Sequence, residues 1–158
     1  MVLSGKQKTA KLKDGTEVTL RELKPEHLDA LHSFFCEAVP EEDRLYLKHN
    51  VVDRKVLEGW VEGRTNRAVR RVLVFHGDEV IADGAIEHHP HGWSSHVAEV
   101  RLVVARTYHG KGAGLLLLKE LVHEAQTKGV EIMKAQVFEN SPNGLAVFQK
   151  LGFRMETV

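Results

Sequence analysis

The sequence predicts one α/β domain of mixed α+β type, in which helices cover both faces of a central mixed β-sheet. Two patterns predict it: a pair of β-branched strands around a turn at residues 76–79, and a later strand–helix–strand–helix succession over residues 97–151. A length of 158 residues fits a core that needs neither a disulfide nor a metal. We therefore expect residues 1–158 to form one domain, with residues 1–15 as a flexible tail or the lead-in to a first strand.

The first half of the chain predicts one strand and two helices. Apolar and polar residues alternate over residues 16–23, which indicates a strand. Pro25 suits the first turn of a helix that Pro40 ends, and Asp53 can cap a second helix that Gly63 follows. The residues expected on the buried faces of the two helices are Leu28, Leu31, Phe34, Phe35 and Ala38, and then Val56, Leu57, Trp60 and Val61.

The second half supplies most of the predicted sheet. Residues 69–75 and 80–87 form a hairpin, and the polar loop HHPHGWSS follows at residues 88–95. Residues 97–105 form a nearly continuous apolar run, which is typical of a central strand buried on both faces. The remaining elements expected are a helix at 115–127, a strand at 130–138, a helix that begins at Ser141-Pro142 and ends at Gly152, and a short last strand at 153–158.

The composition excludes several classes of function. Lys plus Arg and Asp plus Glu both number 22, so no broad cationic field is present to hold nucleic acid or an anionic membrane. The longest apolar run is about five residues, whereas a bilayer span needs ~20, and the start lacks the apolar segment of a signal peptide. A single cysteine, Cys36, excludes an internal disulfide, and its place after Phe34 and Phe35 predicts a buried structural thiol. We expect a cytoplasmic protein without nucleic-acid or membrane partners.

The most informative segment is VRLVVARTYHGKGAGLLLLKEL, residues 100–121. A buried strand turns into a helix through three alternating glycines, Gly110, Gly112 and Gly114. Backbone N–H groups and the positive end of the helix dipole favour a phosphate there, and Arg106 and Lys111 add cationic side chains. Leu115 stands where a dinucleotide fingerprint needs glycine, and the Walker pattern is absent. Taken alone, the glycines could also serve only to tighten the turn.

Two motifs together resemble the GNAT superfamily, the acetyl-CoA-dependent N-acetyltransferases. The first is HGKGAG, residues 109–114, which is similar to the family's pyrophosphate loop Q/R-x-x-G-x-G/A. The second is NSPNGLAVFQKLGF, residues 140–153, which is similar to an asparagine-capped helix with a K-L-G-F-like end. The resemblance extends over residues 16–153, and the segment at 23–47 resembles the GNAT domain of Pat-type protein-lysine acetyltransferases. It implies a GNAT-type acyl-CoA N-acyltransferase fold with acetyl-CoA as cosubstrate.

The resemblance also implies which residues bind the coenzyme. In the family the coenzyme lies where two central strands splay apart, here residues 97–105 and 130–138. The positions that match the family's binding residues are Leu102, Val103, Val104, His109, Gly110, Lys111, Gly112, Ala113, Gly114, Asn140, Ser141 and Phe148. A backbone N–H near Val104 would polarise the thioester carbonyl. His109 replaces the usual Gln or Arg, and Phe148 replaces a tyrosine, so we expect solvent or the amine proton to protonate the leaving thiolate.

Glu99 matches the position of the general base in Pat-type sequences, and we expect it to be catalytic. A base is useful because few lysine amines are neutral at pH 7. Glu87 and His96 are rival bases, and Tyr108 is an alternative acid. The expected reaction is acetyl transfer to a primary amine, which is a protein lysine, an N-terminus or a small amine. The alternative is a catalytically silent acyl-CoA sensor. A short last strand would leave an edge that can pair two chains as a homodimer.

Four histidines gather in and around the loop at residues 88–95, namely His88, His89, His91 and His96. Imidazole is a common metal ligand, but neighbours on a turn with proline and glycine do not fix a tetrahedron, and no cysteine supports them. We therefore expect no metal site. The loop is then either a substrate-facing loop or an exposed polar one.

Overall fold

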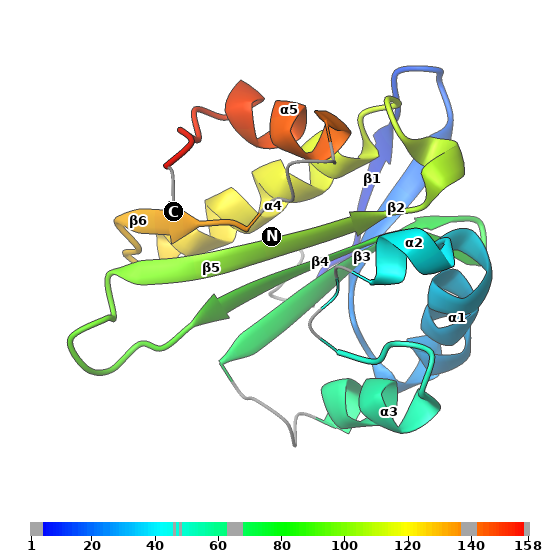
Figure 1. Ribbon diagram of the computed structural model, residues 1–158, viewed down its shortest axis with the longest axis horizontal. Helices are drawn as coiled ribbons and strands as arrows, with labels where there is room; N and C mark the ends of the chain where they lie inside the picture. The colour runs from blue at the N-terminus through cyan, green and yellow to red at the C-terminus, as the bar shows by residue number, and fades with distance from the viewer. Residues whose placement is uncertain (1–4, 46, 48, 63–67, 137–141, 157–158) are drawn as a thin grey trace.

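The computed structural model describes residues 5–45, 47, 49–62, 68–136 and 142–156. These residues form a six-stranded sheet in the order β1-β2-β3-β4-β5-β6. The strands are β1 (Lys8–Lys11), β2 (Glu17–Glu22), β3 (Val69–His76), β4 (Glu79–His88), β5 (Val97–Val104) and β6 (Ile132–Lys134). The first five strands pair antiparallel in succession, whereas β6 pairs parallel with β5. The predicted mixed sheet is confirmed (Figure 1).

Helices cover both faces of the sheet, as predicted (Figure 1). One face carries α1 (Leu28–Ser33), α2 (Glu41–Arg44) and α3 (Arg54–Glu62), and the other carries α4 (Ala113–Thr127) and α5 (Pro142–Lys150). Each face has its own apolar core. Val72 and Val74 of β3 pack in the core beneath α4, whereas Leu73 and Phe75 pack with α1 and α3. Because side chains alternate across a strand, one apolar stretch supplies both cores.

The segment after Pro25 changes its helical pitch twice. A 3₁₀ turn, η2 (Pro25–His27), leads into α1, which continues as a π turn, η3 (Phe34–Ala38). Phe34 and Phe35 are both buried in this turn, so the next residue, Cys36, faces outward. The expected burial of Cys36 is therefore wrong: its Sγ lies 3.5 Å from Nε2 of His32 at an exposed position.

The structure also shows how the second helix begins. The N–H of Lys55 donates to Oδ1 of Asp53 at 3.0 Å, immediately before α3. Asp53 thus satisfies a backbone donor that the helix itself leaves without a partner, which confirms its predicted capping role.

Both ends of the chain differ from the simplest expectation. Residues 8–11 form β1 rather than a tail, and the exposed lysines of this strand are typical of a sheet edge. β6 is shorter than the strand predicted at 130–138, of which residues 137–138 lie outside the described residues. Residues 153–156 form no strand, because the N–H of Phe153 donates to the carbonyl of Phe148 and its ring packs against that of Phe148. This end of the chain therefore closes α5 instead of extending the sheet.

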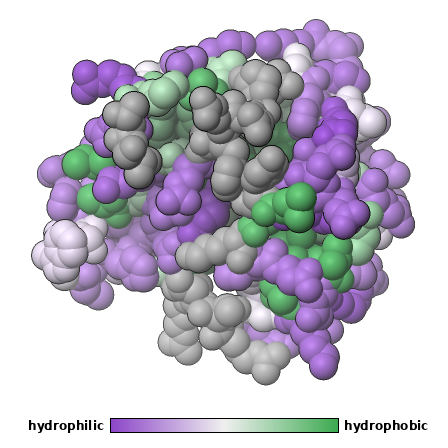
Figure 2. Space-filling model, in the orientation of Figure 1, coloured by the Kyte–Doolittle hydropathy of each residue, from purple (hydrophilic) through white to green (hydrophobic). Residues whose placement is uncertain are grey.

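The visible surface in Figure 2 is largely hydrophilic, with hydrophobic residues in separate small groups. Among the described residues, the large hydrophobic side chains that are exposed come from different parts of the chain: Leu45, Val52, Trp93, Ile132 and Met155. Within the described ranges, every helix is too short or too polar to cross a bilayer.

Helix α4 lies directly on β4 because Gly84 has no side chain. A Cβ atom at this position would stand 2.7 Å from Cγ and 2.8 Å from Cδ2 of Leu117, whose side chain is fully buried. Real Cβ atoms do not approach other atoms so closely, so a side chain here would have to push α4 away from the sheet. Gly84 is also the cross-strand partner of Leu102, and it therefore sets the depth of α4 beside β5.

Gly84→Ala is expected to lower the free energy of unfolding by about 1–3 kcal/mol, because Leu117 cannot move aside in a filled core. Leu117→Ala opens space at the same point. The double variant should therefore lose less stability than the sum of the two single losses. Urea unfolding of the four proteins measures this coupling, and strictly additive losses would contradict the contact.

Candidate active site

Strands β5 and β6 separate soon after they pair. Their register joins Val97 to Ile132 and ends at Glu99 and Lys134, whereas β5 continues to Val104. The carbonyl of His96 accepts from the N–H of Ile132 on the β6 side, and the N–H of Ala105 donates to Ile81 on the β4 side. Because backbone groups alternate sides along a strand, those of Leu102 and Val104 face the side where β6 has ended. The ladder between β5 and β6 ends where the family resemblance implies that the strands splay, and this end of the ladder is called the splay below.

The three β5 residues predicted to bind the coenzyme do not face one way. Leu102 and Val104 present their backbones to the splay and pack their side chains against the α4 core. The backbone of Val103 faces β4, and its side chain packs in the opposite core. His109 also meets this strand: its Nε2–H donates to the carbonyl of Val104 at 2.9 Å. Its ring is thus bonded to the strand that lines the splay.

The glycine turn joins β5 to α4 through a short 3₁₀ turn, η4 (Arg106–Tyr108). Gly110 has φ 77° and Gly112 has φ 91°, values that glycine adopts most readily. Gly114 serves by its size, because a Cβ there would lie 3.4 Å from Val104 and 3.6 Å from Val147. The turn therefore lets β5, α4 and α5 meet closely.

The N-terminus of α4 is suited to an anion. Gly112 is its N-cap, no side chain caps it, and Ala113 is buried directly behind it. The first N–H groups of a 15-residue helix thus lie at the end of the splay without a side-chain acceptor. Together with the positive end of the helix dipole, they fit a phosphate group, so this turn fits the coenzyme that the family resemblance implies.

Of the two cationic side chains expected beside the turn, Arg106 is paired with α2, and Lys111 lies at the turn. Arg106 donates to Glu42 at 2.6 Å and to Asp43 at 2.8 Å, both in α2, and these carboxylates raise its pKa. Its guanidinium is therefore engaged by α2. Lys111 remains at the turn, with Nζ 3.5 Å from Oδ2 of Asp14 and 5.2 Å from the centre of the Tyr108 ring.

Lys13 is a residue at the turn that sequence reasoning missed. Its N–H donates to the carbonyl of Lys111 at 3.0 Å, and its side chain lies against Gly112. The dipeptide Asp14-Gly15 at the tip of the β1–β2 hairpin is the signal that could have found it, since Asp-Gly commonly marks such turns.

Glu99 lies on the face of the sheet that α1 and α3 cover, because its neighbours Ala98 and Val100 pack in the α4 core. Its side chain is 40% exposed, and its Oε1 lies 3.1 Å from Nη2 of Arg101. The same Nη2 donates to Oε2 of Glu87 at 2.8 Å, and Glu87 is the cross-strand partner of Glu99. Two carboxylates thus share one guanidinium.

The family is decided by a comparison that covers both the splay and the glycine turn. The family model described as "Acetyltransferase (GNAT) family" matches residues 26–153, which is most of the chain. The chain belongs to the GNAT acetyltransferase family. As a GNAT protein it is an acyltransferase, and the family and the enzyme class expected from the sequence are confirmed. A search of curated proteins found no similar sequence.

Several solved structures share this architecture. The GNAT domain of S. lividans PAT has a TM-score of 0.81 at 20% identity, over 96% of this chain and 89% of that one. A GNAT acetyltransferase from Streptococcus pneumoniae has a TM-score of 0.69 at 19% identity, over 89% and 86% of the two chains. The ribosomal-protein-alanine N-acetyltransferase from Brucella melitensis has a TM-score of 0.71 at 24% identity, over 85% and 83%. The expected GNAT fold and the likeness to a Pat-type domain are confirmed.

The remaining GNAT positions lie on or near α5. Asn140 and Ser141 lie outside the described residues. Phe148 is 7% exposed, and its ring packs edge-on against Phe153 at a centroid distance of 5.1 Å. Phe148 is therefore a core residue of α5, and its contact with the coenzyme stays a prediction.

Of the rival catalytic groups in this GNAT protein, Tyr108 and Glu87 have side-chain partners in the fold. The hydroxyl of Tyr108 is hydrogen-bonded to Nδ1 of His76 at 2.8 Å. His96 meets β6 through its backbone carbonyl. Glu87, next to Glu99, remains the rival base that the geometry brings to the same place.

A hydrogen bond joins the two ends of the histidine loop, residues 88–95. Nε2–H of His88 donates to the carbonyl of Ser95 at 2.7 Å, whereas Nε2 of His89 lies 3.6 Å from Glu87. Trp93 is 92% exposed on this loop. In the described part of the chain, no group of three or more His, Cys, Asp or Glu side chains is arranged to hold a metal ion.

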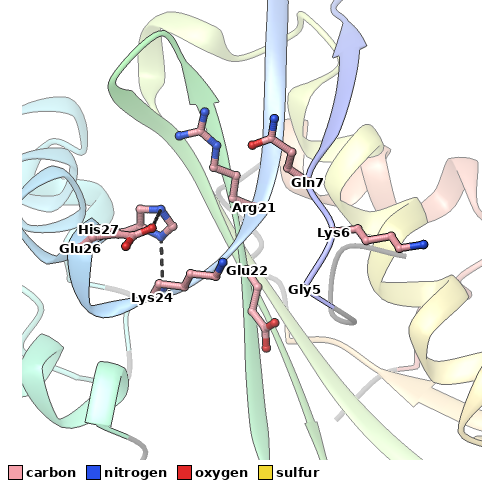
Figure 3. Close-up of a pocket in the computed structure, with 8 residues that line it drawn as sticks. All are labelled: Gly5, Lys6, Gln7, Arg21, Glu22, Lys24, Glu26 and His27. Atoms are coloured by element: carbon pink, nitrogen blue, oxygen red, sulfur yellow. Dashed lines mark hydrogen bonds and ion pairs between the residues drawn. The ribbon is translucent and has the colours of Figure 1, made fainter.

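A polar pocket lies at the opposite edge of the sheet, where β2 leads into η2 (Figure 3). Its charges are of both signs, and Glu22 in its wall is bound by Arg70 at 2.8 Å. The side chains of Arg21 and Lys6 point apart in Figure 3, so they do not converge on one ligand. His27 is buried against Phe75, and burial lowers its pKa. This pocket is separate from the glycine turn and the splay.

Proposed function

We propose that this chain transfers the acetyl group of acetyl-CoA directly to a primary amine, which is a protein lysine, an N-terminus or a small amine. The observation that carries the proposal is the continuity of the β5 backbone at the splay with the uncapped N-terminus of α4. An exposed strand backbone can pair with the amides of a pantetheine arm, and the helix N-terminus can bind a diphosphate. Family membership supports the same donor.

Acetyl-CoA supplies a thioester carbonyl, which an amine attacks readily once it is neutral. The backbone N–H of Val104 lies on the splay side of β5 and would donate to the carbonyl oxygen, a contribution of about 3 kcal/mol for such a fixed donor. Glu99 accepts the proton that the attacking nitrogen loses. The amide C–N bond forms as the thioester C–S bond breaks. Solvent then protonates the thiolate, because Phe148 has no acidic hydrogen.

The acceptor would enter on the side of Glu87 and Glu99. Glu99 is 40% exposed, so its carboxylate can meet an ammonium group from solvent. A carboxylate at this place supports an amine acceptor over a carboxylate or phosphate acceptor. The acceptor itself is chosen by loops that differ between proteins of one fold.

A silent acyl-CoA sensor is the second candidate, and one observation favours it. Phe148 lies in the core at the position where the family often has a tyrosine, so this side chain supplies no acid. A sensor would bind CoA at the same turn without cleaving the thioester.

Thiol release from acetyl-CoA, measured with a panel of small amines and lysine peptides, tests the proposal. We expect release that depends on the added amine and is near zero without it. Calorimetric binding of CoA without thiol release for any amine would instead establish the sensor. Absence of CoA binding would overturn both.

A further inference from the structure

Two lysines meet at the glycine turn, and a third lies on the helix that packs beside it. Lys13 comes from the β1–β2 hairpin, Lys111 from the turn itself, and Lys150 is the last residue of α5. In Figure 1 the β1–β2 hairpin lies beside the segment that leads into α4. The side-chain carbons of Lys13 lie 3.5–3.8 Å from the point where a Cβ of Gly112 would stand. The lysine stem is thus packed over the N-cap of α4.

Lys150 lies on α5, which packs beside the start of α4. It lies one turn after Val147 on α5, and Val147 packs against Gly114 at the start of α4. The charge of Lys150 lowers the pKa of Lys13, because the two like charges repel one another. Lys13 lies against Gly112, and Lys150 lies one helical turn from the contact between Val147 and Gly114, so the two lysines flank the start of α4.

The nearby carboxylate does not separate these two charges. Asp14 accepts from the backbone of Thr16 and pairs with Lys111. Among the described residues, neither Lys13 nor Lys150 forms an ion pair with a carboxylate. An anion placed between the two ammonium groups would replace repulsion by two charge-assisted hydrogen bonds.

We propose that Lys13 and Lys150 form a cationic clamp for a phosphate group of the coenzyme, beside the helix N-terminus that the glycine turn provides. The inference rests on the proposed function, because acetyl-CoA is the expected ligand of this turn. A phosphate monoester carries about −1.5 to −2 charges near pH 7, which matches two ammonium groups. CoA offers two sources of phosphate here, the 3′-phosphate of its ribose and the diphosphate. The backbone N–H groups of α4 already suit the diphosphate.

Isothermal calorimetry with CoA and with dephospho-CoA tests the clamp. The variants are Lys13→Ala, Lys150→Ala and their double, and Lys11→Ala on the same hairpin is the matched control because Lys11 is also an exposed lysine. We expect each clamp variant to weaken CoA binding roughly tenfold, the value of one charge-assisted hydrogen bond. The double variant should lose more, and Lys11→Ala should bind as the unchanged protein does.

The two ligands separate the two sources of phosphate. A loss confined to CoA, with dephospho-CoA unaffected, supports the clamp and assigns it to the 3′-phosphate. An equal loss for both ligands supports the clamp and assigns it to the diphosphate. Unchanged affinity for both ligands in the double variant would overturn the clamp, while leaving the proposed function intact. If the unchanged protein bound no CoA, the proposed function itself would fail.

Discussion

Glu99→Gln is expected to lower kcat/KM for acetyl transfer about 100-fold at pH 7, the usual scale for loss of a general base. Glutamine keeps the size and hydrogen-bonding capacity of the side chain but cannot accept the proton of an ammonium group. Glu99 lies on β5 away from the glycine turn, so affinity for CoA should stay unchanged. Steady-state thiol release together with calorimetry measures both quantities.

Two further variants locate the base. Glu87→Gln removes the rival carboxylate that shares Arg101 with Glu99, and it should cost less activity than Glu99→Gln. Glu17→Gln changes an exposed carboxylate on the distant strand β2 and should leave turnover as it is. Full turnover of Glu99→Gln at pH 7 would show the assignment to be wrong, and a 100-fold loss in Glu87→Gln alone would transfer the role to Glu87.

Arg71→Met is expected to lower the free energy of unfolding by about 3–5 kcal/mol at pH 7, because it leaves a buried carboxylate without its counter-charge. Nη1 of Arg71 donates to Oδ2 of Asp83 at 2.8 Å, and the two side chains are only 10% and 4% exposed. The guanidinium also stacks 3.4 Å from the centre of the Trp60 ring. Nε of Arg71 and Oδ1 of Asp83 have no other partner among the described residues, so no second bond compensates.

This loss should depend on pH in a definite direction. Burial raises the pKa of Asp83, and Arg71 opposes that rise. Removal of Arg71 takes away this opposing effect, so the pKa of Asp83 in the folded variant rises still further above its value in the unfolded chain. Between the two pKa values the folded state binds more protons than the unfolded chain, so the stability of the variant improves as the pH falls through the folded pKa towards the unfolded one. The destabilisation should thus be larger at pH 7 than at pH 5.

Urea unfolding at both pH values measures the effect, and Arg70→Met is the matched control. Arg70 lies next to Arg71 in strand β3 and pairs with Glu22, but both side chains of that pair are partly exposed. Its loss should stay below about 1 kcal/mol and change little with pH. Equal losses for the two arginine variants, or a loss for Arg71→Met that is the same at pH 5 and pH 7, would contradict the buried pair.

The sequence predicts this fold well where the pattern is local. β-branched residues close together in the sequence predict the β3–β4 hairpin, and closely spaced glycines after an apolar run predict the strand–turn–helix succession. β1 is harder to predict because only Ala10 of this four-residue strand packs against the core, so Lys8–Lys11 show no apolar alternation. Cys36 was misplaced because a π turn changes which residue faces outward.

The course of the backbone at the site could be predicted from the sequence, whereas the contacts of its side chains could be predicted less well. The glycine turn follows from a short motif, and the splay follows from the family resemblance that this motif supports. In contrast, Arg106 finds partners in Glu42 and Asp43, more than sixty positions earlier in the chain. Lys13 reaches the turn only after β1 and β2 have paired. Such contacts between distant segments are set by the tertiary fold, and no local pattern encodes them.

The two bonds of Arg106 have a practical meaning for kinetic work on this protein. They fasten the short acidic helix α2 to the residues that precede the glycine turn, and they lie at exposed or partly exposed positions. Mobile ions weaken such contacts, since the Debye length shrinks from ~10 Å at 0.1 M to ~3 Å at 1 M ionic strength. In assay buffers of different ionic strength, the ion pairs that attach α2 to Arg106 would therefore differ in strength. Rates measured for different acceptors are comparable only when the electrolyte is kept constant.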